Sequence, residues 1–129
     1  MIHGKAYYVE IKLHKVKNMK REPIFEIARS SDKKYYWSLK ASFGQVLLTS
    51  GIYTSKDKCI EGIVLSKASI KNSNFLPQQT TNGEYYIVQI STDCQFLSRS
   101  EFYSAKGSME IGLVAIKKCI PIAETFEIL

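Results

Sequence analysis

Cysteine and histidine are scarce in this sequence of 129 residues, and the scarcity argues against most metal and nucleophile chemistry. The three cysteines, Cys59, Cys94 and Cys119, are an odd number at wide spacing and form no CxxC motif. Reduced thiols in a cytosolic protein are the expected state, and a disulfide or a metal site is the rarer alternative. The two histidines, His3 and His14, have no cysteine or carboxylate at a spacing typical of a metal site or a catalytic triad. We therefore expect no metal, no cofactor and no enzyme activity.

Long apolar runs are absent as well. No stretch approaches the roughly 20 apolar residues that a membrane helix requires. The residues after Met1 contain no apolar segment of signal-peptide length, so nothing indicates export. With 45% hydrophobic and 23% charged residues, the chain has the composition of an ordinary globular protein. We therefore predict a cytoplasmic protein.

The net charge of +6 is concentrated near the N-terminus. Residues 1–40 hold ten Lys and Arg against four Asp and Glu, whereas residues 41–129 hold eight of each. A basic arm of this kind could contact nucleic-acid phosphates, with tyrosines nearby to stack on bases. A solvated basic face that needs no partner is the commoner meaning of such a charge distribution. The candidate anion or nucleic-acid contacts are Lys12, Lys15, Lys17, Lys20 and Arg21.

One stretch of the chain occurs twice, fifty positions apart. Without any gap, Tyr35-Tyr36 aligns with Tyr85-Tyr86, and Gly62 aligns with Gly112. A period of this length is typical of a duplicated supersecondary unit, and such units usually bury together what neither buries alone. Other aligned identities are Phe25 with Phe75, Tyr53 with Tyr103, Lys56 with Lys106 and Val64 with Val114.

Each repeat predicts three strands followed by one helix, from the alternation of apolar residues and then from their helical spacing. The strands are expected at residues 25–28, 35–40 and 45–52, and again from 75, at 85–90 and at 95–102. Pro77 removes a backbone donor, which indicates an edge strand. The predicted fold class is α+β: tandem βββα repeats that form one antiparallel sheet of about six strands with two helices on one face.

The N-terminal segment has no counterpart in the repeat. Residues 6–13 alternate, with Tyr7, Val9, Ile11 and Leu13 on one side, and predict an extra strand. The predicted organisation is a strand and basic connector at residues 1–23, then a single domain at 24–129. This domain consists of repeats at 24–73 and 74–121 and a short C-terminal tail, whose residues 124–128 alternate as in a last strand.

These motifs resemble the YegP-like family of small bacterial and archaeal proteins, over residues 24 to about 120. The first repeat carries Phe25-Glu26-Ile27, Leu39-Lys40-Ala41, Gly44-Gln45-Val46 and Tyr53-Thr54-Ser55-Lys56, and the second carries Tyr103-Ser104-Ala105-Lys106, Gly112-Leu113 and Lys117-Lys118. Phe43, Cys94 and Ile60-Glu61 depart from the family pattern. The resemblance implies a tandem βββα fold and no particular activity, because the family's function is uncharacterised.

Two pairs of aligned residues, one inside the helices and one just before them, have both a packing and a binding interpretation. A glycine inside a helix costs roughly 1 kcal/mol relative to alanine, so Gly62 and Gly112 indicate close packing or, less often, a ligand against bare backbone. Tyr53 and Tyr103 are expected to fix the corner between strand and helix. The alternative is an anion site at the helix N-terminus.

The face of the sheet away from the helices gives the main functional prediction. In the first repeat it carries Tyr36 with polar neighbours, whereas in the second it carries Tyr86, Val88 and Ile90, which are apolar. A strand that is apolar on both sides is normally covered on both sides. The cover could be the N-terminal strand, a second subunit or another partner.

The sequence thus predicts a non-catalytic binding module that forms a homodimer or binds a protein partner through Tyr36, Tyr86, Val88 and Ile90. The alternative is a protein that associates weakly with nucleic acid through its basic arm. An enzyme of unrecognised type is the third hypothesis.

Overall fold

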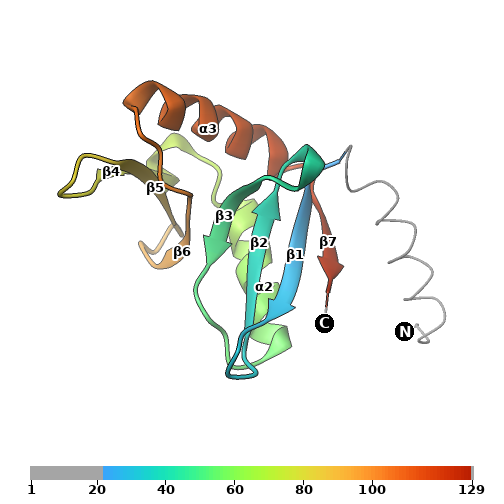
Figure 1. Ribbon diagram of the computed structural model, residues 1–129. Coiled ribbons are helices and arrows are strands. Elements are labelled where there is room, and N and C mark those ends of the chain that lie inside the picture. Colours follow the sequence, from blue (N-terminus) through green and yellow to red (C-terminus); the bar gives the residue numbers. More distant parts are fainter. Residues whose placement is uncertain (1–21, 129) are drawn as a thin grey trace.

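The computed structural model describes residues 22–128, which form one mixed sheet of seven strands and two long helices (Figure 1). The strands lie side by side in the order β4-β5-β6-β3-β2-β1-β7. Their bounds are β1 Ile24–Arg29, β2 Tyr35–Lys40, β3 Val46–Ser50, β4 Phe75–Gln79, β5 Tyr85–Ile90, β6 Phe96–Arg99 and β7 Glu124–Glu127. The long helices are α2, Lys56–Ala68, and α3, Lys106–Cys119, and two short 3-10 turns are η1, Ser42–Gly44, and η2, Asn72–Asn74. The α+β prediction is confirmed, and the predicted strand at 6–13 lies outside the described residues.

The sheet is antiparallel throughout both repeats, but it is not wholly antiparallel as predicted. The seventh strand, β7, pairs in parallel with β1 and so makes the sheet mixed. The Ile128 amide donates to the Ile27 carbonyl at 2.8 Å, and the Lys56 ammonium lies 2.9 Å from a Glu127 carboxylate oxygen. The C-terminal strand therefore fastens the start of α2 to the outer strand of the first repeat.

Local sequence explains how the strands and helices begin and end. The Ser55 hydroxyl caps α2 by accepting from the Lys58 amide at 3.2 Å. Gly83 supplies a positive φ of 90° in the second repeat's first turn, where the first repeat has Lys33 at 65°. Phe43 and Cys94, at the tips of the β2–β3 and β5–β6 hairpins, have φ of 69° and 64°. Both non-glycine residues therefore occupy the left-handed region that favours glycine.

The two repeats meet where β3 pairs with β6. Thr49 lies opposite Arg99, its own counterpart fifty positions later, and Ser50 lies opposite Ser98. Because β3 pairs antiparallel with β6, its counterpart in the other repeat, an approximate two-fold axis runs normal to the sheet between them. Such an axis places α2 and α3 on the same face, as predicted. Each helix also contacts the third strand of the other repeat: α2 contacts β6, and α3 contacts β3.

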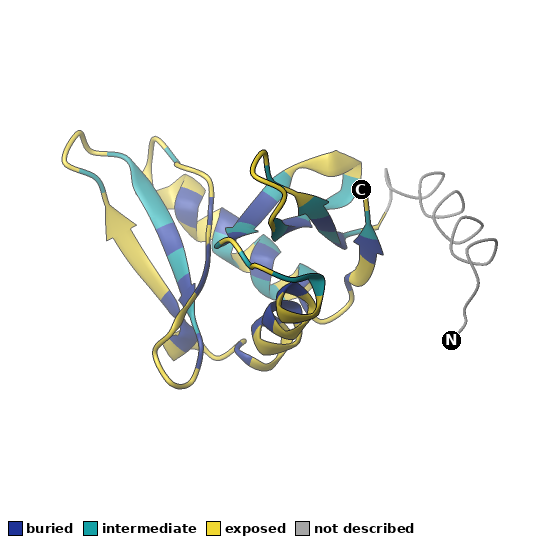
Figure 2. Ribbon diagram, turned by 90° about the horizontal axis from the view of Figure 1, so that it is seen from below, coloured by how far each residue is buried: buried dark blue, intermediate teal, exposed yellow. Residues whose placement is uncertain are grey.

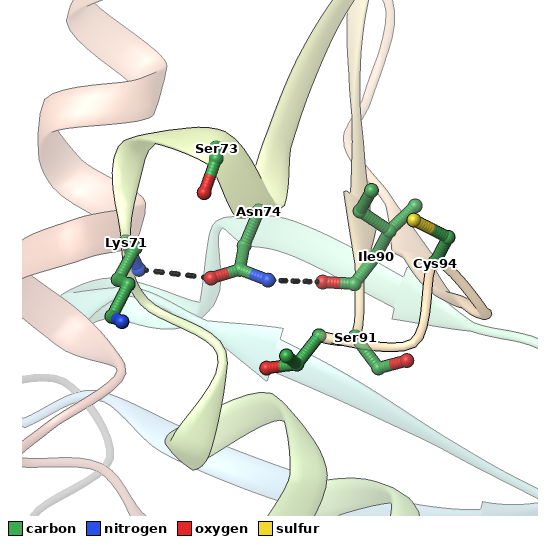
Figure 3. Close-up of a pocket in the computed structure, with 7 residues that line it drawn as sticks. Lys71, Ser73, Asn74, Ile90, Ser91 and Cys94 are labelled. Atoms are coloured by element: carbon green, nitrogen blue, oxygen red, sulfur yellow. Dashed lines mark hydrogen bonds between the residues drawn. The ribbon is translucent and has the colours of Figure 1, made fainter.

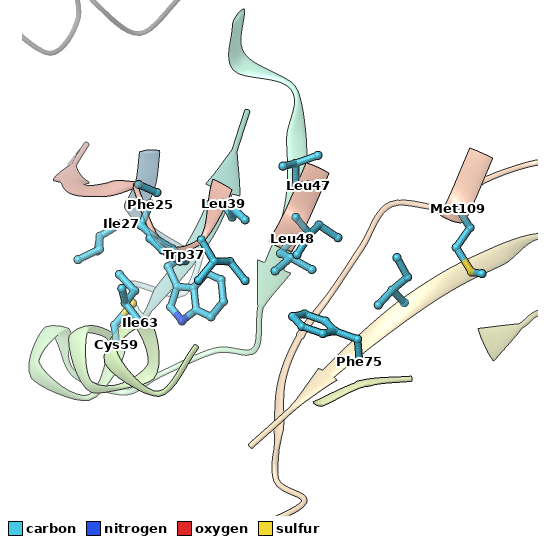
Figure 4. Packing of buried hydrophobic residues seen from close by; sticks show 14 residues of the cluster. Phe25, Ile27, Trp37, Leu39, Leu47, Leu48, Cys59, Ile63, Phe75 and Met109 are labelled. Atoms are coloured by element: carbon cyan, nitrogen blue, oxygen red, sulfur yellow. The ribbon is translucent and has the colours of Figure 1, made fainter. Parts of the chain in front are cut away.

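One hydrophobic core lies between the helices and the sheet (Figure 4). Trp37 and Leu39 point into it and are fully buried, as the alternation predicted. Met109 and Ile116 enter it from α3, and Cys59 enters it from α2. The helices turn their buried residues toward the sheet and their exposed residues outward (Figure 2). Within residues 22–128, neither helix has the length and apolarity that crossing a membrane would require.

Gln89 is a fully buried polar residue where the first repeat has Leu39. Its side-chain oxygen accepts from the Ser66 hydroxyl at 2.9 Å and from the Ser98 hydroxyl at 3.0 Å. Its side-chain nitrogen donates to the backbone carbonyls of Ser66 and Ser69, both at 3.1 Å. All four bonds of the amide are therefore made, and they join the end of the first repeat's helix to the second repeat's strands.

Pro77 lies in the middle of β4, which is one of the two edge strands of the described sheet, as predicted. Its partner Ile87 directs both backbone groups toward Ser100 on the other side: the Ile87 amide donates to the Ser100 hydroxyl, and the Ile87 carbonyl accepts from the Ser100 amide, each at 2.8 Å. Pro77 therefore turns its own backbone nitrogen, which has no hydrogen, toward the outer side of β4.

Candidate functional site

The face of the sheet opposite the helices changes character between the repeats. Strand pairing places one residue from each strand in a single row across it, in the order Glu26, Ser38, Thr49, Arg99, Val88 and Leu76. The first three belong to the first repeat and are polar. Beyond Arg99 the row becomes apolar.

In the first repeat, the charged residues of this face satisfy each other. A Glu26 carboxylate oxygen lies 2.9 Å from the Lys40 ammonium, and both side chains are largely buried. The second repeat has Leu76 and Ile90 at the corresponding positions, so the ion pair is replaced by two apolar side chains. The apolar character of this face is thus specific to the second repeat.

Aromatic side chains extend the apolar area. Phe102 packs edge-on against Tyr86 with ring centroids 5.3 Å apart, and the Arg99 guanidinium lies 4.7 Å from the Phe102 centroid. Phe96, which is opposite Ile90, is 53% exposed, and Phe102 is 47% exposed. We call this surface the second-repeat face, and it consists of Leu76, Tyr86, Val88, Ile90, Phe96, Arg99 and Phe102.

The four residues predicted to form the binding surface do lie away from the helices. Tyr86, Val88 and Ile90 are half-buried members of the second-repeat face, whereas Tyr36 lies in the first repeat beyond the polar part of the row. Their neighbours on β4 and β6 were not predicted as site residues, because only the pairing of the strands brings them beside β5. Phe102, just after β6, was not predicted either, because only the fold brings its ring against Tyr86. The predicted basic contacts Lys12, Lys15, Lys17, Lys20 and Arg21 lie outside the described residues.

A pocket of about 220 Å³ lies beside this face, between η2 and the β5–β6 hairpin (Figure 3). Asn74 fixes its wall: its side-chain oxygen accepts from the Lys71 amide at 3.1 Å and its nitrogen donates to the Ile90 carbonyl at 2.9 Å. The remaining lining is mainly small and polar, and includes the exposed Cys94. Because Ile90 belongs to both surfaces, the pocket continues the second-repeat face toward the hairpin.

The helix corners support the packing interpretation. A Cβ added to Gly62 would lie 2.2 Å from the Tyr53 hydroxyl oxygen, and a Cβ added to Gly112 would lie 2.2 Å from that of Tyr103. Each glycine thus makes room for the tyrosine of its own repeat. Burial raises the pKa of both tyrosine hydroxyls, which favours their neutral form. The two tyrosines therefore explain why glycine is needed at positions 62 and 112, and no ligand has to be invoked.

The described residues offer little for catalysis. No group of three or more His, Cys, Asp or Glu within residues 22–128 is arranged to hold a metal ion. All three cysteines are free, and burial raises the pKa of the Cys59 thiol to about 11, so this thiol stays protonated near neutral pH. Cys94 is exposed, but no base is among the residues that line its pocket besides the Lys71 amine.

Comparison with known proteins identifies relatives over most of the chain. The family model described as a domain of unknown function, DUF1508, matches residues 30–72, which is most of the first repeat. The solution structure of the protein of unknown function yegP from E. coli has a TM-score of 0.77 and 26% identity, covering 82% of this chain and 92% of that one. The solution structure of UPF0339 protein SO3888 from Shewanella oneidensis, 21% identical, has a TM-score of 0.78 over 82% of this chain and 91% of that one. The latter likeness concerns the fold alone.

Sequence similarity gives the same assignment. UPF0339 protein PA0329 from Pseudomonas aeruginosa is 28% identical over 100 residues, covering 77% of this chain and 91% of the relative. UPF0339 protein YegP from Escherichia coli K12 is 31% identical over 94 residues, covering 72% of this chain and 86% of the relative. Both names denote proteins of uncharacterised function, as the resemblance in the sequence implied. This chain belongs to the UPF0339 family of YegP-like proteins.

Proposed function

We propose that this protein is a non-catalytic interaction module whose second-repeat face binds a short apolar segment of a protein partner. The observation that carries the proposal is the replacement of the buried Glu26–Lys40 ion pair by Leu76 and Ile90 at the corresponding positions of the second repeat. Exposed apolar area on one half of an otherwise polar face is typical of a binding surface.

The composition of the second-repeat face supports a protein partner. It has three aromatic residues, three aliphatic ones and a single cation, Arg99, with no lysine and no carboxylate. The cores of protein–protein interfaces are enriched in aromatics and arginine and depleted in lysine and acidic residues. A face that bound nucleic acid through its own residues would need more positive charge. The nucleic-acid hypothesis for the basic arm stays a prediction.

The size of the face supports a short segment rather than a whole domain. An aromatic side chain has roughly 200 Å² of surface, so Phe96 and Phe102, at 53% and 47% exposure, together present about 200 Å². With Leu76 at 37% exposure and the half-buried residues, the apolar area is about 300–400 Å², the size of a large surface patch on a monomer. A stable dimer buries about 800 Å² per partner, so this area suits a few side chains.

Selection of peptides by phage display on the full-length protein tests the proposal. We expect the wild type to enrich peptides rich in apolar residues, because these complement the face. Val88→Lys should abolish the enrichment by placing a charge at its centre. The control is Ile111→Lys, which changes a residue that is 73% exposed on α3 and should leave the enrichment intact.

The same variants decide between kinds of partner. Light scattering over a range of protein concentrations measures self-association. A wild-type dimer that only Val88→Lys dissociates would make a second copy the occupant. Peptide enrichment that is absent, or that survives Val88→Lys, would overturn the proposal.

A further inference from the structure

The occupant of the second-repeat face in the absence of a partner can be sought within the chain itself. Residues 6–13 read AYYVEIKL, with Tyr7, Val9, Ile11 and Leu13 at alternate positions. In an extended conformation these four side chains share one side, while Glu10 and Lys12 share the other. A segment with one apolar side needs an apolar surface to cover it.

The size of the second-repeat face favours this segment over a second copy. The second-repeat face presents about 300–400 Å² of apolar area, less than half of what each partner of a stable dimer contributes. Four side chains from one side of a single strand match an area of this size. The first repeat offers no equivalent surface, because its central positions hold Glu26, Ser38 and Lys40.

The connecting chain is long enough. The described chain enters the sheet at Ile24, at the start of β1, and β1 is separated from β5 by four strand-to-strand steps. At about 4.8 Å for each step, β5 lies about 19 Å across the sheet from β1. The ten residues 14–23 span at most about 33–36 Å when extended. Residues 6–13 can therefore reach the second-repeat face of their own chain.

We propose that residues 6–13 bind the second-repeat face of the same chain through Tyr7, Val9, Ile11 and Leu13, and that a partner's apolar segment displaces them. The displacement rests on the proposed function, whereas the contact within the chain does not. The N-terminal segment then regulates access to the second-repeat face, since a partner must compete with residues 6–13 of the same chain. Covalent attachment supplies these residues at a high effective concentration.

Paramagnetic broadening of amide signals tests the contact in the full-length protein. A nitroxide is attached at Lys12→Cys, on the polar side of the segment, with Cys94→Gly and Cys119→Ser to prevent labelling elsewhere; Cys59 is fully buried. We expect stronger broadening at the amide of Val88 than at that of Glu26. The reverse order is expected if the segment stays near its attachment at β1, and that result would overturn the proposal.

Three further samples make the result specific. Val9→Asp with Ile11→Asp should remove the broadening at Val88, and Glu10→Gln should retain it. The third sample is an equal mixture of two proteins: one carries the nitroxide but no ¹⁵N, and the other carries ¹⁵N but no nitroxide. Broadening at Val88 in this mixture would show that the segment comes from a second copy, contrary to the proposal.

The variants also separate this inference from the proposed function. If the segment competes with partners, Val9→Asp with Ile11→Asp should raise the affinity of the selected peptides by about tenfold or more, and unchanged affinity would refute the competition. If no peptide is enriched but the broadening is found, the contact within the chain stands and the proposed function fails.

Discussion

The contact between Gly112 and Tyr103 leads to a prediction of different effects of alanine at two glycines of one helix. Gly112 and Gly107 both lie in α3. A Cβ at Gly112 would lie 2.2 Å from the hydroxyl oxygen and 2.6 Å from Cζ of Tyr103, whereas a Cβ at Gly107 would meet nothing within 4 Å. Gly107→Ala should therefore stabilise the protein, and Gly112→Ala should destabilise it relative to Gly107→Ala.

The size of the difference follows from two opposing terms. Replacing glycine by alanine gains up to about 1 kcal/mol in a helix interior, and no more than this at Gly107, the second residue of α3. At Gly112 the new methyl group also forces the half-buried ring of Tyr103 to move, and overpacking of this kind costs about 1–3 kcal/mol. Because the helix gain at Gly112 offsets at most about 1 kcal/mol of this cost, the free energy of unfolding of Gly112→Ala should lie below that of Gly107→Ala by up to about 3 kcal/mol.

Urea unfolding followed by the fluorescence of Trp37 measures this difference, since Trp37 is the only tryptophan and is fully buried. Tyr103→Phe in the Gly112→Ala background should recover part of the loss, because it removes the closest atom and leaves Cζ in place. If Gly112→Ala is as stable as Gly107→Ala, the glycine is not required by the tyrosine and the packing argument is refuted.

Two other predictions concern buried and exposed side chains of the described structure. Gln89→Leu should lower the free energy of unfolding by about 1–3 kcal/mol, because carbonyl and hydroxyl groups at the end of α2 and on β6 lose their buried partner. Urea unfolding measures this free energy, and an unchanged value would mean that the hydrogen-bond network does not stabilise the fold. Iodoacetamide at pH 8 should modify Cys94 long before Cys59, since burial raises the pKa of Cys59 to about 11 and keeps its reactive thiolate rare. Intact mass, with Cys94→Ser as the control, reads the result, and equal rates for the two thiols would contradict it.

Much of the fold follows from local patterns. The alternation around Trp37 identified the strand and the side that is buried, and the fifty-residue period predicted a similar order of strands and helix in the second repeat. The direction of β7 could not be predicted in this way. Alternation at residues 124–128 indicates a strand. Its pairing in parallel with β1 depends on where the C-terminal end of α3 lies relative to the sheet, and alternation does not predict that position.

The candidate site was predictable only along a single strand. Val88 and its neighbours on β5 stand out because the side of that strand away from the helices carries Tyr86, Val88 and Ile90 and no charged residue. Leu76 and Phe96 join them through pairing with β5, and Phe102 joins them through its ring contact with Tyr86. A sequence read one segment at a time contains neither the register nor this contact. Gln89 shows the same limit from the other side of the sheet. Its polar side chain is compatible with the core only because the end of α2 happens to lie above it.

Pro77 has a consequence for the behaviour of the protein at high concentration. A strand from a neighbouring molecule that tried to extend the sheet at β4 would find no amide hydrogen at the middle of the ladder. Growth of the sheet into ribbons that run from molecule to molecule is therefore discouraged at that border. The second-repeat face can therefore be apolar and exposed while the β4 edge resists the strand addition that leads to fibrils.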